Sequence, residues 1–159
     1  MCVALYIGAD REPPLVPWNE AARGFNVVLL QDHERVVAKH FSKPHLSYLG
    51  AHTGCSCGFD YGQSSADTSE EKEEERLGRE SVASLRRYLE QMVEISGSVE
   101  LFACWEGEWD EACESRREVT TEHFGGESFE VKQRELLLVR AAAQPDVQSD
   151  VPSVRGLTP

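Results

Sequence analysis

The sequence predicts an α+β (or mixed α/β) fold, in which a single mixed β-sheet of four to six strands packs against one long amphipathic helix and a second, short helix. Short runs rich in β-branched and aromatic residues recur along the chain, and glycines and prolines separate them. A helical pattern of apolar residues extends over Val82–Val93. This helix stands between the third and fourth predicted strands, so it can cross the sheet and give it mixed strand directions.

The N-terminal half of the chain supplies three predicted strands, each a short apolar run bounded by turn residues. They span residues 2–8, 25–31 and 45–51. Between the second and third strands, Asp32 can cap a short helix over 33–41, which Pro44 would prevent from continuing. The inner face of this helix is predicted to carry Val36, Val37 and Phe41.

The long helix is the element that the sequence defines best. Thr68 and Glu71 fit a capping box at its start, and Gly97 can end it. The residues over 62–75 are polar and rich in serine and glutamate, and we expect them to form a mobile acidic loop. Two strands are predicted after the helix, over 98–105 and 135–140, the second with 129–131 as a bulged extension, and a short turn of helix over 119–124 lies between them.

The domain organisation predicted from composition is one globular domain over 1–143 and a disordered C-terminal tail over 144–159. The tail holds three prolines and no compact apolar run. Its Val151, Val154 and Leu157 recur at every third position, a spacing with which a tail can dock in a groove on a protein partner.

The net charge of −12 predicts an acidic surface that would repel a phosphate backbone, so we expect no nucleic-acid partner. No run approaches the roughly 18 apolar residues of a membrane span, so we also expect a soluble protein with no membrane partner. The five cysteines are an odd number, and no secretion signal is recognisable at Met1. Reduced thiols in a cytoplasmic protein are the expectation.

The chemically unusual part of the sequence is a run of histidines and cysteines between His33 and Cys57. Neutral imidazole and thiolate are the ligands that zinc and softer metals prefer. His52, Cys55 and Cys57 fall within one turn, and Gly54 and Gly58 give that turn backbone freedom. Cys2 can supply a fourth ligand if the first and third strands are neighbours. The predicted metal ligands, for zinc or another thiophilic metal, are therefore His52, Cys55, Cys57 and Cys2.

Other interpretations of the same residues stay open. Cys55 and Cys57 are close enough for a small, strained disulfide, which would make the turn a thiol-redox site. They can equally be inert thiols in a turn of small residues. The protein would then be a non-catalytic interaction module, or a small enzyme whose reaction the sequence does not define. Dinucleotide-binding, phosphate-loop and nucleophile-elbow motifs are all missing from the sequence, so no catalytic residue is assigned.

Overall fold

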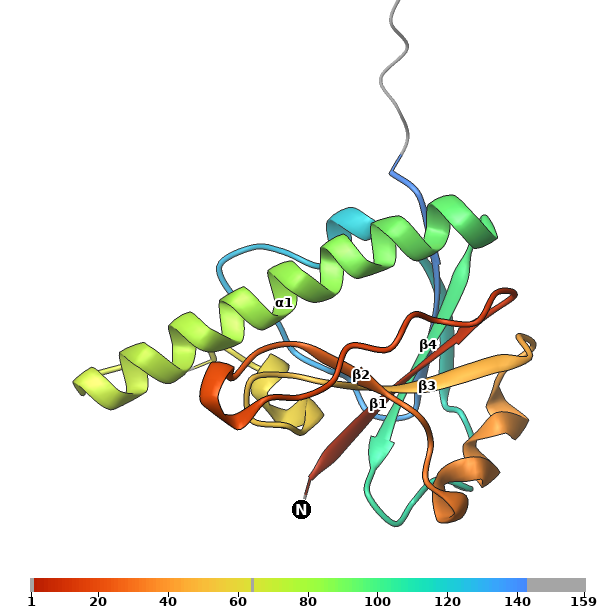
Figure 1. Ribbon diagram of the computed structural model, residues 1–159, viewed down its shortest axis with the longest axis horizontal. Coiled ribbons are helices and arrows are strands. Elements are labelled where there is room, and N and C mark those ends of the chain that lie inside the picture. The colour runs from red at the N-terminus through yellow and green to blue at the C-terminus, as the bar shows by residue number, and fades with distance from the viewer. Residues whose placement is uncertain (1, 64, 143–159) are drawn as a thin grey trace, which may run out of the picture.

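The computed structural model of the chain describes residues 2–63 and 65–142, and their strands form one mixed sheet (Figure 1). The strand order is β2-β3-β1-β4-β6-β5. Neighbouring strands are antiparallel, except that β5 and β6 are parallel. The strands are β1 (Val3–Ala9), β2 (Asn26–Val28), β3 (His45–Gly50), β4 (Val99–Trp105), β5 (Ser115–Thr120) and β6 (Glu135–Arg140).

Helices cover both faces of this sheet, which confirms the predicted α+β class. The long helix α1 (Ser69–Ser96) lies across one face, and the 3-10 helix η2 (Asp32–His40) packs on the other (Figure 1). The short 3-10 turns are η1 (Glu20–Ala22), η3 (Ser56–Phe59) and η4 (Thr121–His123). As predicted, α1 connects β3 to β4, and it passes over β1, which lies between them.

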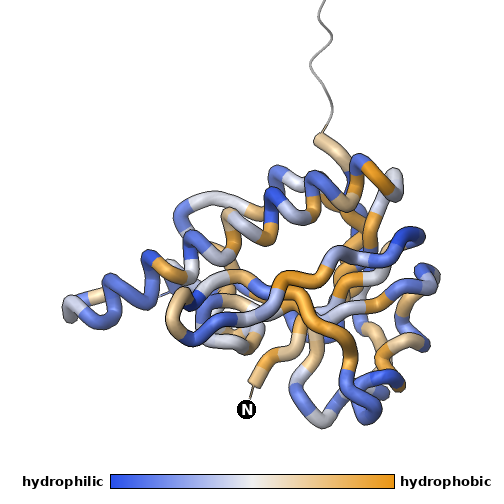
Figure 2. The backbone as a smooth tube through the Cα atoms, viewed as in Figure 1, coloured by the Kyte–Doolittle hydropathy of each residue, from blue (hydrophilic) through white to orange (hydrophobic). Residues whose placement is uncertain are grey.

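The central strand β1 contributes to two hydrophobic cores because its side chains alternate between the faces of the sheet. Leu5 and Ile7 pack on the α1 side with helix residues such as Leu89, whereas Tyr6 packs on the η2 side with Phe102. Figure 2 shows apolar residues concentrated in the strands, while the N-terminal part of α1 projects beyond the sheet and is hydrophilic. Burial on both faces fixes the register of β1, because a one-residue slip would exchange its two sets of side chains.

The ends of α1 agree with the prediction, but its first two turns do not. Thr68 and Glu71 form the capping box, and Gly97 ends the helix with a φ of 76°. The helix begins at Ser69, so the prediction of a loop over 62–75 is wrong for its second half. Ion pairs along the helix, such as Arg76 with Glu73, balance the run of glutamates that made this segment look disordered.

The helix η2 differs from the prediction in its inner face. Glu34, Val37 and His40 are its buried residues, and Val36, predicted to be buried, is 44% exposed. The reason is the 3-10 geometry, which has three residues per turn and therefore brings every third residue to the same face.

Two strand assignments near the C-terminus also change. The edge strand β5 was not predicted, because its sequence is mostly charged or polar, as is common where an edge faces solvent. The predicted helical turn over 119–124 is reduced to η4, and 129–131 makes only a β-bridge from Phe129 to Tyr61.

The predictions of a disordered C-terminal tail and of no membrane span have different outcomes. The tail over 144–159 lies outside the described residues, so its disorder and its docking to a protein partner stay predictions. Within 2–63 and 65–142, no helix is both long enough and apolar enough to cross a bilayer.

Candidate metal centre

The candidate ligands Cys55 and Cys57 lie in the segment 51–58, here called the cysteine turn, which follows β3. The Ala51 amide donates to the Cys55 carbonyl at 3.1 Å, and the Gly54 amide donates to the Ala51 carbonyl at 2.9 Å. Gly54 has a φ of 80°, a left-handed conformation that glycine adopts without strain. These contacts fold the turn back on itself, so that η3 starts directly after Cys55.

Ser56, between the two cysteines, anchors the cysteine turn to the sheet. Its side chain is fully buried, and its hydroxyl accepts a hydrogen bond from the Leu5 amide at 2.8 Å. The same hydroxyl donates to the Leu49 carbonyl at 2.7 Å, so Ser56 links β1 to β3. The Ser56 amide also donates to the Tyr48 hydroxyl at 3.0 Å. With Ser56 pointing into the protein, the flanking cysteines lie at the edge of the core.

Cys2 joins this pair because β1 and β3 are neighbours, as the prediction required. The Sγ atoms of Cys2, Cys55 and Cys57 all lie within 4.8 Å of one another. The Val3 amide donates to the Cys57 sulfur at 3.1 Å, and the Thr53 hydroxyl lies 3.4 Å from the Cys55 sulfur. All three cysteines are free thiols, Cys2 being exposed and the other two partly buried.

The surroundings of Cys57 keep its thiol protonated when no cation is bound. Burial, with a smaller contribution from the adjacent Cys55 thiol, raises the pKa of the Cys57 thiol to about 11. Cys57 is therefore a neutral thiol at physiological pH when no cation is present. A metal ion at the centre would reverse this effect, since a thiol that coordinates a metal is deprotonated.

The spacing of the three sulfurs suits a single metal ion. Zinc–sulfur bonds are about 2.3 Å long, which places three sulfurs about 3.8 Å apart around a tetrahedral ion and about 4.0 Å apart around a trigonal one. Both separations fall within the 4.8 Å limit that the three Sγ atoms satisfy.

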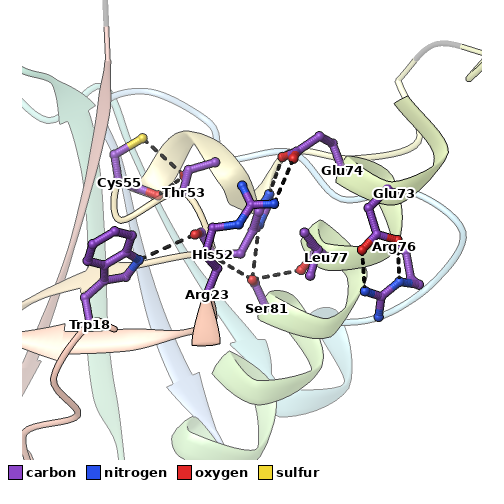
Figure 3. Close-up of polar contacts among 10 residues, drawn as sticks. All are labelled: Trp18, Arg23, His52, Thr53, Cys55, Glu73, Glu74, Arg76, Leu77 and Ser81. Carbon is purple, nitrogen blue, oxygen red and sulfur yellow. Dashed lines mark hydrogen bonds and ion pairs between the residues drawn. The ribbon is translucent and has the colours of Figure 1, made fainter. Parts of the chain in front are cut away.

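The structure does not bring His52 into this group. Its ring is only 3% exposed and points toward α1, where Nε2 lies 2.9 Å from Glu74 Oε2 and Nδ1 lies 3.4 Å from Ser81 Oγ. In Figure 3 the His52 ring faces Glu74, whereas the Cys55 sulfur contacts Thr53. The hydrogen bond from His52, together with Arg23, lowers the pKa of Glu74, so the carboxylate stays ionised. His52 therefore fastens the cysteine turn to α1.

The remaining histidines of the run also lie away from the thiols. His40 stacks on Phe102 at a ring distance of 4.1 Å, and its Nε2 lies 2.9 Å from the Trp109 carbonyl oxygen. His33 lies against the Trp109 ring, and His45 begins β3 at the end remote from the cysteine turn.

The contributions of Thr53, Ser56 and the Val3 amide were missed in the sequence. Ser56 and the Val3 amide act through contacts between segments about fifty residues apart, whereas Thr53 contacts Cys55, two residues away. The one available signal was the small hydroxyl residue between the two cysteines, since serine often binds backbone groups in turns.

Comparisons with known proteins identify no relative of this chain. The chain matches no protein-family model, and no curated protein or solved structure gives a significant match.

Proposed function

We propose that the protein binds a thiophilic metal ion, zinc or another, through the thiolates of Cys2, Cys55 and Cys57. The observation that carries the proposal is the convergence of three sulfurs within 4.8 Å from two segments more than fifty residues apart. The Val3 amide hydrogen lies close enough to the Cys57 sulfur to stabilise thiolate charge. The net charge of −12 further raises the local concentration of cations.

The same cysteines also allow a thiol-redox function, which the electrostatics favour less. A reactive cysteine is normally a thiolate near neutral pH, with its pKa lowered by a cationic group or by a helix N-terminus. The pKa of Cys57 is instead raised, and the helical turn that contains it has only four residues. Metal binding makes use of the proximity of the sulfurs without needing a low thiol pKa in the metal-free protein.

The proposal is tested by the metal content of the full chain purified without a histidine tag. About one equivalent of zinc or another thiophilic metal per chain is expected by elemental analysis. A Cys55→Ser, Cys57→Ser double variant should lose it, whereas Cys113→Ser should keep it. Cys113 is a suitable control because its thiol donates to the Ser115 carbonyl, outside the site.

Two results would contradict the proposal. Metal-free protein that also takes up no added zinc or Cu(I), with an unchanged circular dichroism spectrum, would exclude metal binding. A Cys55–Cys57 disulfide that forms and breaks at cellular potentials, found by thiol counting in the same preparation, would support the redox function instead.

A further inference from the structure

We propose that the metal keeps one coordination position free of protein ligands, and that a small external thiol carrying a positively charged amine binds there. This inference rests on the proposed function, because it describes the fourth ligand of the same metal ion. The cysteines would then hold a metal that exchanges an external ligand, and not a metal whose role is only to stabilise the fold.

The number of protein ligands is the first argument. Zinc is almost always four-coordinate in proteins, and structural sites supply all four ligands from the chain. Among the described residues, no fourth ligand atom from histidine, cysteine, aspartate or glutamate joins the three sulfurs. Three protein ligands with one open position is the pattern of sites where the metal meets an external molecule.

The predicted fourth ligand, His52, is committed elsewhere. An ionised carboxylate only accepts hydrogen bonds, so His52 Nε2–H donates a hydrogen bond to Glu74 Oε2. His52 also donates its backbone N–H to the Ser81 hydroxyl at 3.0 Å. To reach the sulfurs, the ring would have to leave a buried position and break its contacts with α1.

Contacts between protein groups hold the cysteine turn in place. β1 pairs with β3 on one side and β4 on the other, and Ser56 holds the cysteine turn by buried hydrogen bonds. A closed structural site normally supplies folding energy to a segment that lacks such contacts. The cysteine turn already has such contacts, which favours a metal that exchanges ligands over one that only holds the turn in place.

The space beside the site defines the chemistry of the external ligand. Cys55 lines a pocket of about 240 Å³ together with Gln31, Glu34 and Glu106, and none of its lining residues is lysine or arginine. The Glu106 amide donates to the Cys2 carbonyl at 2.9 Å, so the backbone of Glu106 lies beside that of a second ligand residue. A soft metal favours a sulfur donor, and the Glu106 carboxylate favours an ammonium group.

Binding of such a thiol is a ligand exchange without electron transfer. The sulfur of the incoming thiol forms a bond to the metal, its proton passes to the buffer, and a bound water molecule leaves. The oxidation states of the metal and of all sulfurs stay unchanged.

The test uses the full chain loaded with Co(II), whose sulfur-to-metal absorption reports the number of thiolate ligands. Cysteamine should increase this absorption saturably, and thioglycolate, a similar thiol with a carboxylate, should bind more weakly. Glu106→Gln should reduce the preference for cysteamine about two- to fivefold, the range expected for one exposed charge pair. Glu108→Gln, two residues away and outside the pocket lining, is the matched control.

The outcomes separate this inference from the proposed function. A chain that binds Co(II) but whose spectrum does not respond to cysteamine overturns the inference alone. So does a folded His52→Gln variant whose Co(II) spectrum differs before any thiol is added, because His52 would then be a ligand. If His52→Gln does not fold, the cysteamine titration of the unaltered chain decides. A chain that binds no Co(II), zinc or Cu(I) overturns both proposals.

Discussion

Replacing Ser56 with alanine should destabilise the protein and loosen the metal centre at the same time. The substitution removes one hydroxyl that accepts from the Leu5 amide and donates to the Leu49 carbonyl, both in the buried interior. Leaving a buried polar group without a partner costs about 1–3 kcal/mol, so the two groups together predict a loss of about 2–6 kcal/mol. That is a large part of the 5–15 kcal/mol typical of a whole domain.

Urea denaturation of the metal-free protein measures this loss. With a slope of about 1–3 kcal/mol/M, the unfolding midpoint of Ser56→Ala should fall by roughly 1 M or more. Ser65→Ala is the control, since Ser65 is exposed and should change the free energy of unfolding by less than about 0.5 kcal/mol. Equal midpoints for the two variants would refute the argument that Ser56 anchors the cysteine turn. Metal affinity should fall in Ser56→Ala and stay constant in Ser65→Ala.

Three further predictions concern the same region. Because the pKa of Cys57 is raised to about 11, only about one thiol in a thousand is ionised at pH 8 in the metal-free protein. Alkylation of Cys57 in metal-free protein, followed by mass spectrometry, should therefore be slow at pH 8 and accelerate toward pH 11. Fast labelling at pH 8 would contradict the buried environment. Gly58→Ala would place a Cβ 2.7 Å from Thr53 Oγ1 and 2.9 Å from His52 Cε1, so it should lower the free energy of unfolding by about 1–3 kcal/mol, measured by denaturation, and weaken metal binding. Gly24→Ala is the control, because its Cβ would come no closer than 3.9 Å to the Ala22 carbonyl oxygen. The pKa of Glu74 is lowered in the folded protein, so its pair with His52 stabilises the fold above the unfolded pKa near 4.5, and this stability is lost as the pH falls through the folded pKa. The acid-induced loss in the free energy of unfolding should therefore be smaller in Glu74→Gln than in the unaltered chain. Identical pH profiles for the two proteins would show that the pair contributes nothing.

The parts of the fold that could be predicted are those with strong local signals. The capping box at Thr68 and the glycine at Gly97 bound the long helix in both the sequence and the structure. The edge strand β5 escaped prediction because Arg116, Arg117 and Glu118 give it neither an apolar run nor an alternation. Its strand conformation comes from pairing with β6, a contact that local patterns do not contain.

The candidate site could likewise be predicted only in part. Cys2 could be related to Cys55 and Cys57 because strand adjacency follows from a small number of possible sheet orders. The role of His52 depends on which residue of α1 faces it, and the spacing His-x-x-Cys suggests only that the residues are near in sequence. Glu74 and Ser81 lie at i and i+7, two turns of one helix face, and they orient the imidazole away from the thiols.

Because β1 lies inside the sheet, metal binding by the three sulfurs can also report when the sheet has assembled. β1 pairs with β3 and with β4, so its insertion closes contacts to segments about forty and about one hundred residues away. Such distant pairings are slow steps in folding. Cys2 reaches Cys55 and Cys57 only when β1 is inserted in register, so the rate at which a refolding chain acquires tight metal binding would time the completion of the sheet.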